Sequence, residues 1–202
     1  MNPELADRFH AEYYGDGLPF KTSWRGVPMV KCPMDMWAYA DIILSARPDV
    51  LIETGTYRGG SALFFADMMD LAGNGEVVTI DRARAGSVSH DRITYLSGDS
   101  AAMGAEMESY VGERSCMVVL DSDHHKSHVL AELEGMGCLV TSGQYLIVED
   151  TNLGHQVCPD FLGDGPAEAI AEWLPAHPDF EVDATQERHG LTMNPGGWLR
   201  RR

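Results

Sequence analysis

The sequence predicts an α/β domain with a mostly parallel sheet, in which short apolar segments alternate with segments of helical spacing. The runs Val118–Leu120 and Tyr145–Val148 are short, apolar and rich in branched residues, which is typical of buried parallel strands. Each run ends in acidic residues, the first in Asp121–His125 and the second in Glu149–Asp150. Because parallel sheets bind ligands beyond the carboxyl ends of their strands, we expect the functional site there.

The chain begins with its least regular part, up to about residue 40, where turn-forming residues are frequent. Apolar residues at helical spacing then predict a helix over 35–47, which Pro48 ends. A strand over 50–53 leads through a glycine-rich turn into a helix over 61–71. The same reasoning predicts, in chain order, strands 76–81 and 93–96, helix 101–110, strand 116–121, helix 125–134, strand 145–149, a polar loop 152–165, helix 166–174, and strands 180–183 and 191–193.

The chain is strongly acidic, since 15 basic and 31 acidic residues give a formal charge of −16. Nucleic acids and anionic membranes bind basic surfaces, so a small molecule is the expected partner, with homo-oligomers also possible. No leader sequence or membrane-length apolar run is visible, and the four cysteines lack zinc-site spacing. We therefore expect one cytoplasmic domain over 1–202, with an N-terminal cap over about 1–45 and a catalytic core over 46–202.

The first strand ends in Glu53 and a glycine-rich turn that opens the next helix, which is the arrangement of a cofactor loop. Glycine lets the backbone approach a ligand closely, and the first amides of the helix then face that ligand. The turn lacks the glycine spacing of phosphate loops, which disfavours a Rossmann dehydrogenase. The carboxylate of Glu53 suits an ammonium group better than a pyrophosphate. The other expected cofactor contacts of this loop are Gly55, Thr56, Tyr57, Gly59, Gly60 and Ser61.

Acidic residues after the next two strands complete the cofactor prediction. Asp81 ends the second strand, where acids accept both hydroxyls of a ribose. Asp99 and Ser100 follow the third strand, and Asp99 can reach an adenine edge. A ligand with an ammonium, a ribose and an adenine is S-adenosylmethionine. The structural alternative is that Glu53 and Asp81 only form turns at strand ends.

The carboxylates after the fourth and fifth strands predict a metal site. Carboxylates packed together repel one another unless a cation lies among them. Hard oxygen ligands of this kind suit Mg²⁺ or Ca²⁺. For Asp123 the structural alternative is the N-cap of the following helix. The residues expected to converge are Asp121, Asp123, Glu149 and Asp150, with His124 and His125 beside them.

Three segments resemble the cephalosporin hydroxylase/rhamnosyl O-methyltransferase family: Ile52–Ala62, Asp121–His124 and Leu146–Thr151. The resemblance covers the chain from about Lys21 to Arg200. It implies the Rossmann-like fold of class I methyltransferases, with a mostly parallel seven-stranded sheet flanked by helices. It also implies S-adenosylmethionine and Mg²⁺ as cofactors, and methyl transfer to a hydroxyl of a sugar or secondary metabolite, as in antibiotic biosynthesis.

The resemblance assigns metal-binding roles as well. It implies that the adjacent acids Glu149 and Asp150 are ligands, and that either Asp121 or Asp123 is another ligand. The remaining aspartate would then lie behind the metal or contact the cofactor. An alternative function is a non-catalytic cofactor-binding partner of a hydroxylase or methyltransferase system. The acids and histidines argue against this alternative, because a scaffold does not need them.

The base that takes the proton of the acceptor hydroxyl is also implied by the resemblance. It is His124, three residues after Asp121, with its neighbour His125 as the alternative. We expect His128, one helical turn further on, to face solvent.

Overall fold

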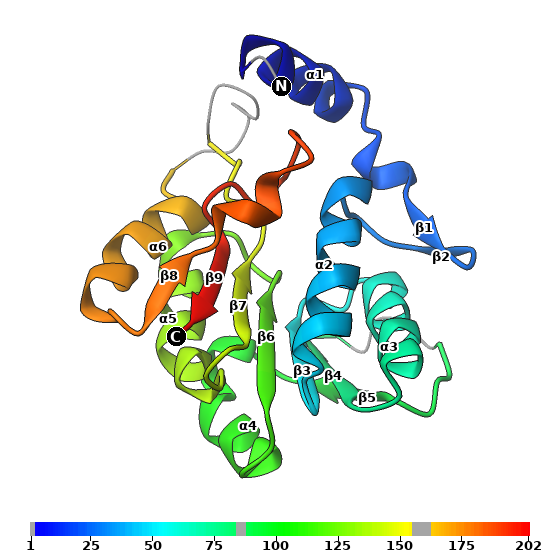
Figure 1. Cartoon of the computed structure of the whole chain (residues 1–202), viewed down its shortest axis with the longest axis vertical. Helices are drawn as coiled ribbons and strands as arrows, with labels where there is room; N and C mark the ends of the chain where they lie inside the picture. The colour runs from blue at the N-terminus through cyan, green and yellow to red at the C-terminus, as the bar shows by residue number, and fades with distance from the viewer. Residues whose placement is uncertain (1–2, 84–87, 155–162) are drawn as a thin grey trace.

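The computed structural model describes residues 3–83, 88–154 and 163–202, and its centre is a seven-stranded sheet with helices on both faces (Figure 1). The strand order is β5–β4–β3–β6–β7–β9–β8. The first five of these strands pair in parallel, which confirms the predicted fold class. The order reverses between β3 and β6, so the loops after these strands diverge and open a crevice. The parallel strands are β3 (Val50–Thr54), β4 (Glu76–Asp81), β5 (Ile93–Ser97), β6 (Cys116–Leu120) and β7 (Tyr145–Val148).

Two antiparallel strands, β8 (Phe180–Val182) and β9 (Trp198–Arg201), complete the sheet, with β9 between β7 and β8. The predicted strand over 191–193 is wrong. This segment is a loop, because the backbone N–H of Met193 donates to the carboxylate of Asp35 instead of to a neighbouring strand. The seventh strand is β9, whose terminal arginines hide the strand pattern in the sequence.

Alternate residues of a strand face opposite sides of the sheet, and each side has its own apolar core. In β3, Val50 and Ile52 face one core and Leu51 faces the other. The predicted helices agree with the structure to within one or two residues at each end, except that 101–110 divides into a 3₁₀ turn (Ser100–Ala102) and α4. The first face carries α4 (Gly104–Val111), α5 (Lys126–Met136) and α6 (Pro166–Trp173), and the second carries α2 (Pro33–Ala46) and α3 (Gly60–Ala72) (Figure 1).

The N-terminal forty residues are more regular than predicted. Leu5 and Phe9 lie one turn apart in the first helix and are both exposed, so this helix does not bury them in the core. Trp24 packs edge-on against Phe64 and donates its indole N–H to Asp67 at 2.7 Å, which fastens the N-terminal hairpin to α3. The elements are α1 (Pro3–Gly15), a 3₁₀ turn (Pro19–Lys21), β1 (Ser23–Trp24) and β2 (Val27–Pro28).

The polar segment 152–165 follows β7, and its residues 155–162 lie outside the described part of the chain. The division into a cap over 1–45 and a core over 46–202 stays a prediction, although α2 packs directly on the sheet. Among the described residues, no helix combines the length and the apolar character needed to cross a membrane.

Asp35 ties α2 to the loop before β9. Its carboxylate is buried and accepts the N–H of Met193 at 2.9 Å. Burial raises the pKa of Asp35 to about 7, although the hydrogen bond from Met193 opposes this rise. Because the pKa is higher in the folded than in the unfolded chain, protonation of Asp35 favours the folded state. This contribution is complete below about pH 4 and is lost as the pH rises through about 7.

We expect Asp35→Asn to gain stability relative to the wild type as the pH is raised from 5 to 8, by on the order of 2–4 kcal/mol. Asparagine keeps an acceptor for Met193 and does not ionise. Urea unfolding at pH 5, 6.5 and 8 measures the difference, with Asp41→Asn on the exposed side of α2 as the control. Parallel stability curves for wild type and Asp35→Asn would contradict the expectation.

Candidate active site

The crevice between β3 and β6 is closed at its base by Gly55, the first residue after β3. Gly55 has a φ of +86°, and a Cβ atom there would lie 1.8 Å from the carbonyl oxygen of Asp121. The N–H of Gly55 donates to Ile80 at 2.8 Å, and the N–H of Asp121 donates to Thr54 at 3.1 Å. The ends of three neighbouring strands are therefore joined around a position that only glycine fits.

Asp81 fixes the rest of the glycine-rich loop. Its Oδ2 atom accepts the backbone N–H groups of Thr56 and Tyr57, both at 3.1 Å. Asp81 also lines the cavities on both sides of the loop, so its remaining lone pairs are available to a ligand. The other predicted loop residues, Gly59, Gly60 and Ser61, form the start of α3.

Glu53 lies behind this loop and is fully buried. Its Oε2 atom accepts the hydroxyl of Thr79 at 2.6 Å, whereas Oε1 has no hydrogen-bond partner among the described residues. Burial raises the pKa of Glu53 to about 7, and the charge of Lys31 opposes this rise. A buried acceptor without a donor is compatible with the expected ammonium ligand, although Glu53 lines neither cavity.

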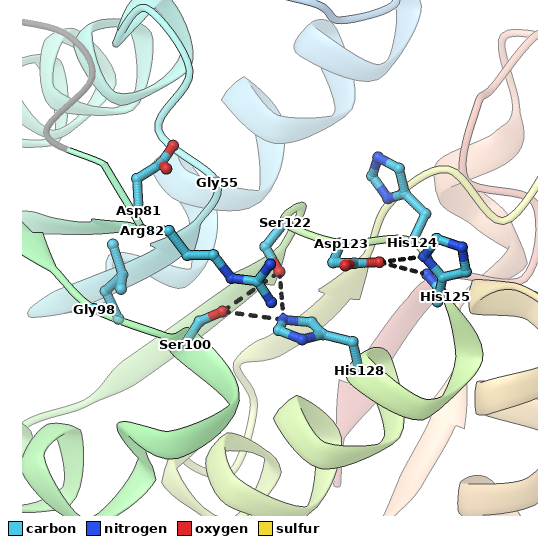
Figure 2. A pocket seen from close by; sticks show the side chains of 11 residues that line it. Gly55, Asp81, Arg82, Gly98, Ser100, Ser122, Asp123, His124, His125 and His128 are labelled. Atoms are coloured by element: carbon cyan, nitrogen blue, oxygen red, sulfur yellow. Dashed lines mark hydrogen bonds and ion pairs between the residues drawn. The ribbon is translucent and has the colours of Figure 1, made fainter.

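The first cavity, of about 410 Å³, lies between Asp81 and the start of α5 (Figure 2). His128 Nε2 lies 3.0 Å from the hydroxyl of Ser122 and 3.3 Å from that of Ser100. The Ser122 hydroxyl donates to the buried Glu132 at 2.7 Å, and contact with Glu132 raises the pKa of His128. The expectation that His128 faces solvent is therefore wrong, because this polar network holds its ring in the cavity wall.

Asp99, predicted to reach an adenine, is exposed and lies outside the residues that line the first cavity. Its Oδ1 atom accepts the N–H of Ala101 at 3.3 Å, so in this structure it caps the turn before α4. Ser100, its neighbour, does line the cavity. Of the pair predicted after β5, the structure therefore brings only Ser100 to the cavity wall.

A second cavity, of about 420 Å³, lies on the other side of the loop, and its wall includes three of the residues predicted for metal binding and catalysis. Ligand atoms of Asp121, His124 and Asp150 lie within 4.8 Å of one another, with 3.3 Å between His124 Nε2 and Asp150 Oδ2. Asp150 has a φ of +56°, and its N–H donates to the side chain of Asn194 at 2.9 Å. Burial raises the pKa of Asp121 and of Asp150, opposed by Lys31 at Asp121 and by His124 at Asp150.

Glu149, the fourth predicted ligand, lies deeper than these three. Its Oε1 atom accepts the hydroxyl of Tyr39 at 2.7 Å and lies 2.7 Å from the ammonium of Lys31. The same ammonium contacts Asp121 Oδ2. Burial raises the pKa of Glu149 to about 7. Burial alone would lower the pKa of Lys31, but the carboxylates of Asp121 and Glu149 raise it above its usual value.

Asp123 and His125 form a separate pair at the start of α5. Asp123 Oδ1 accepts the N–H of His125 at 3.0 Å and lies 2.6 Å from His125 Nδ1, and these contacts lower the pKa of Asp123. Figure 2 shows the ring of His125 facing Asp123 and the ring of His124 turned away. The structure thus brings His124 and Asp121 to Asp150, and leaves Asp123 and His125 in a turn.

The donor set fits a divalent cation. Asp121, Glu149 and Asp150 bring three carboxylates together, against the single ammonium of Lys31. Burial is the main cause of the raised pKa of each acid, and repulsion from a neighbouring acid adds to it. Mg²⁺ prefers oxygen ligands and is usually bound by one or two carboxylates together with water, which Asp121 and Asp150 can supply in part.

The sequence interpretation missed Lys31, Tyr39 and the environment of His128. Lys31 contacts Asp121 across 90 residues of the sequence, and Tyr39 contacts Glu149 across 110. No local pattern reports such contacts.

The model of the family described as rhamnosyl O-methyltransferase/CmcI matches residues 17–202 of the chain. A rhamnosyl O-methyltransferase of Mycobacterium leprae (strain TN) is 36% identical over 211 residues, which is 98% of this chain and 91% of that protein.

Solved structures of CmcI share the fold. A CmcI structure described with Mg and SAM has a TM-score of 0.70 at 24% identity, over 91% of this chain and 77% of that one. A CmcI structure described with SAH has a TM-score of 0.65 at 25% identity, over 89% of this chain and 82% of that one.

We expect Gly55→Ala to destabilise the protein more than Gly143→Ala. Both positions have similar positive φ values, but a Cβ at Gly143 meets no atom within 4 Å, whereas one at Gly55 collides with Asp121. The backbone strain alone should cost about 1–2 kcal/mol at either position, so the excess at Gly55 measures the collision. Urea unfolding of the two variants provides the comparison. Equal losses would show that the approach of Gly55 to Asp121 is not tight in solution.

Proposed function

Since this chain belongs to the rhamnosyl O-methyltransferase/CmcI family, it is an S-adenosylmethionine-dependent O-methyltransferase, and we propose that its acceptor is a hydroxyl of a sugar or another secondary metabolite, with Mg²⁺ bound at the acids. The observation that carries the proposal is that two cavities meet at one loop. Gly55, Asp81 and His124 belong to the walls of both. A methyl donor in the first cavity and an acceptor in the second would meet at this loop.

The first cavity is the proposed site of the adenosine part of the donor. Asp81 can accept the ribose hydroxyls with the lone pairs that the Thr56 and Tyr57 amides leave open. The network of His128 and Ser122 forms the wall opposite the loop. Its donors and acceptors suit the edge of a purine base.

The second cavity is the proposed acceptor site. Its wall combines apolar and charged groups, so it suits a molecule with an apolar face and a polar edge. Sugar rings have this character, because their C–H faces pack on aromatic and apolar side chains while their hydroxyls reach polar groups. The name of the mycobacterial relative, rhamnosyl O-methyltransferase, agrees with such an acceptor. The apolar wall consists of Tyr14, Phe20, Met29, Leu153 and Met193, and the polar edge consists of Lys31, Asp121, His124 and Asp150.

In the proposed mechanism the chain aligns the acceptor hydroxyl with the activated methyl group and removes its proton. Asp121 and Asp150, with Glu149 behind them, would hold Mg²⁺, which when bound lowers the pKa of a coordinated hydroxyl. His124 Nε2 is the proposed base, because it lines both cavities and lies beside Asp150. His125 is occupied with Asp123 and lines only the first cavity.

The metal requirement is tested with metal-stripped protein, isotopically labelled S-adenosylmethionine and a panel of rhamnosides and other glycosides. We expect the label to reach an acceptor hydroxyl when Mg²⁺ is present, to be absent from it in EDTA, and to return with excess Mg²⁺. Calorimetric titration of S-adenosylmethionine shows in parallel whether the donor binds. Full transfer without metal would refute the Mg²⁺ assignment, and failure to bind the donor would refute the function itself.

We expect His124→Ala to lower kcat by roughly 10²–10⁴-fold, the usual range for loss of a general base. The affinity for S-adenosylmethionine should change little. His125→Ala is the matched control, and its kcat should stay near the wild-type value. Loss of kcat in His125→Ala alone would place the base at His125. Loss of Mg²⁺ binding in His124→Ala, measured by calorimetry, would make His124 a ligand instead.

A further inference from the structure

Lys31 has an environment that is unusual for lysine. Its side chain is 2% exposed, and its ammonium lies 2.7 Å from Glu149 Oε1 and also contacts Asp121 Oδ2. Lysine is almost never buried to this extent unless it is paired. Here it has two carboxylate partners from two neighbouring strand ends, β6 and β7. The ammonium therefore lies among the same acids that the proposed metal would need.

The fold holds Lys31 in this place from both sides. Met29, two residues before Lys31, is buried in the core under α2 and α3, and its N–H donates to Thr22 at 3.1 Å. The following Cys32 is buried against Leu191 and Met193, and α2 begins at the next residue. With its neighbours anchored in two apolar clusters, the backbone at Lys31 has little freedom, and the ammonium is directed at the acids.

The charges around Lys31 indicate that its ammonium balances part of the negative charge of the acids. Three carboxylates, those of Asp121, Glu149 and Asp150, lie at this end of the sheet, and Glu53 adds a fourth charge close enough to affect the ammonium. His124 faces Asp150, and the hydroxyl of Tyr39 donates to Glu149. Without Lys31, no lysine or arginine among the described residues would pair with Asp121 or Glu149.

We propose that Lys31 is the resident counter-cation of the acid cluster: it stabilises the fold in the absence of a metal and competes with a divalent cation for Asp121 and Glu149. This proposal rests on the proposed function only in its second half, since the first half concerns the metal-free protein. The chain should therefore fold without bound metal. The same ammonium should weaken the binding of Mg²⁺ to Asp121 and Glu149.

The test compares Lys31→Met with Lys126→Met in metal-stripped protein. Lys126 pairs with Asp164 and Glu172 away from the acid cluster, so it controls for the loss of a lysine. We expect Lys31→Met to lower Tm by roughly 5–15 °C without metal, because a buried charge pair loses one partner. Lys126→Met should stay close to the wild type. A wild-type Tm for metal-free Lys31→Met would overturn the counter-cation role.

Competition is tested by adding MgCl₂ to the same proteins. We expect Mg²⁺ to raise Tm more in Lys31→Met than in the wild type, and calorimetry to show Mg²⁺ binding at least about tenfold tighter, because a nearby positive charge is gone. Equal or weaker Mg²⁺ binding by Lys31→Met would overturn competition. If wild type and variant both fail to bind Mg²⁺, the proposed metal site fails, and the metal-free comparison still decides the structural role.

A second variant keeps the test decisive if Lys31→Met does not fold. The double variant Lys31→Met/Glu149→Gln removes one negative charge together with the ammonium, and glutamine keeps an acceptor for Tyr39. We expect it to fold without metal and to recover most of the lost Tm. A double variant that remains as unstable as the single variant would show that Lys31 acts through packing and not through charge.

Discussion

The concentration of carboxylates at one buried end of the sheet is the constraint on which the site depends. Glu53, Asp121, Glu149 and Asp150 lie at the carboxyl ends of three neighbouring parallel strands, where the topology forces them together. Burial raises the pKa of all four, because each charge loses water that its neighbours do not replace. The ammonium of Lys31 offsets part of this charge, and the remaining negative charge supports the proposed metal site at this end of the sheet.

The reversal of strand order between β3 and β6 explains why two cavities share a wall. Loops leaving neighbouring strands in opposite directions open a crevice, and Gly55 keeps that crevice narrow by lying against Asp121. A residue with a side chain at this position would push the two strand ends apart. The short distance between the proposed donor and acceptor sites is therefore a property of the backbone. His124 and Asp81, the proposed base and the proposed ribose acceptor, line both cavities.

The central fold could be predicted because its strands are buried on both faces and so have continuous branched runs. The segments outside this central part of the sheet were predicted less accurately. Leu191–Met193 has an alternating pattern but forms a loop that bonds to Asp35, whereas β9 ends in arginines and pairs with two strands. In α1, Leu5 and Phe9 lie one turn apart but are exposed, so burial of these side chains does not account for the helix. Tertiary contacts decide the conformation of Leu191–Met193 and of β9, and a local sequence pattern does not contain such contacts.

The residues of the candidate site also differ in how far the sequence predicts them. The acids at strand ends could be predicted because each directly follows its strand in the sequence. The sequence could not show that Asp121, and not Asp123, joins the acid cluster, because this depends on the turn in which Asp123 accepts the N–H of His125. Lys31 is invisible because its partners are distant in sequence. The position of Lys31 also bears on the proposed acceptor cavity, because the segment that directs its ammonium at the acids includes Met29, which lines that cavity. The stretch from Met29 to Lys31 thus sets both the charge balance at the sheet end and the position of the proposed acceptor wall. A substitution that moves this stretch should alter both properties.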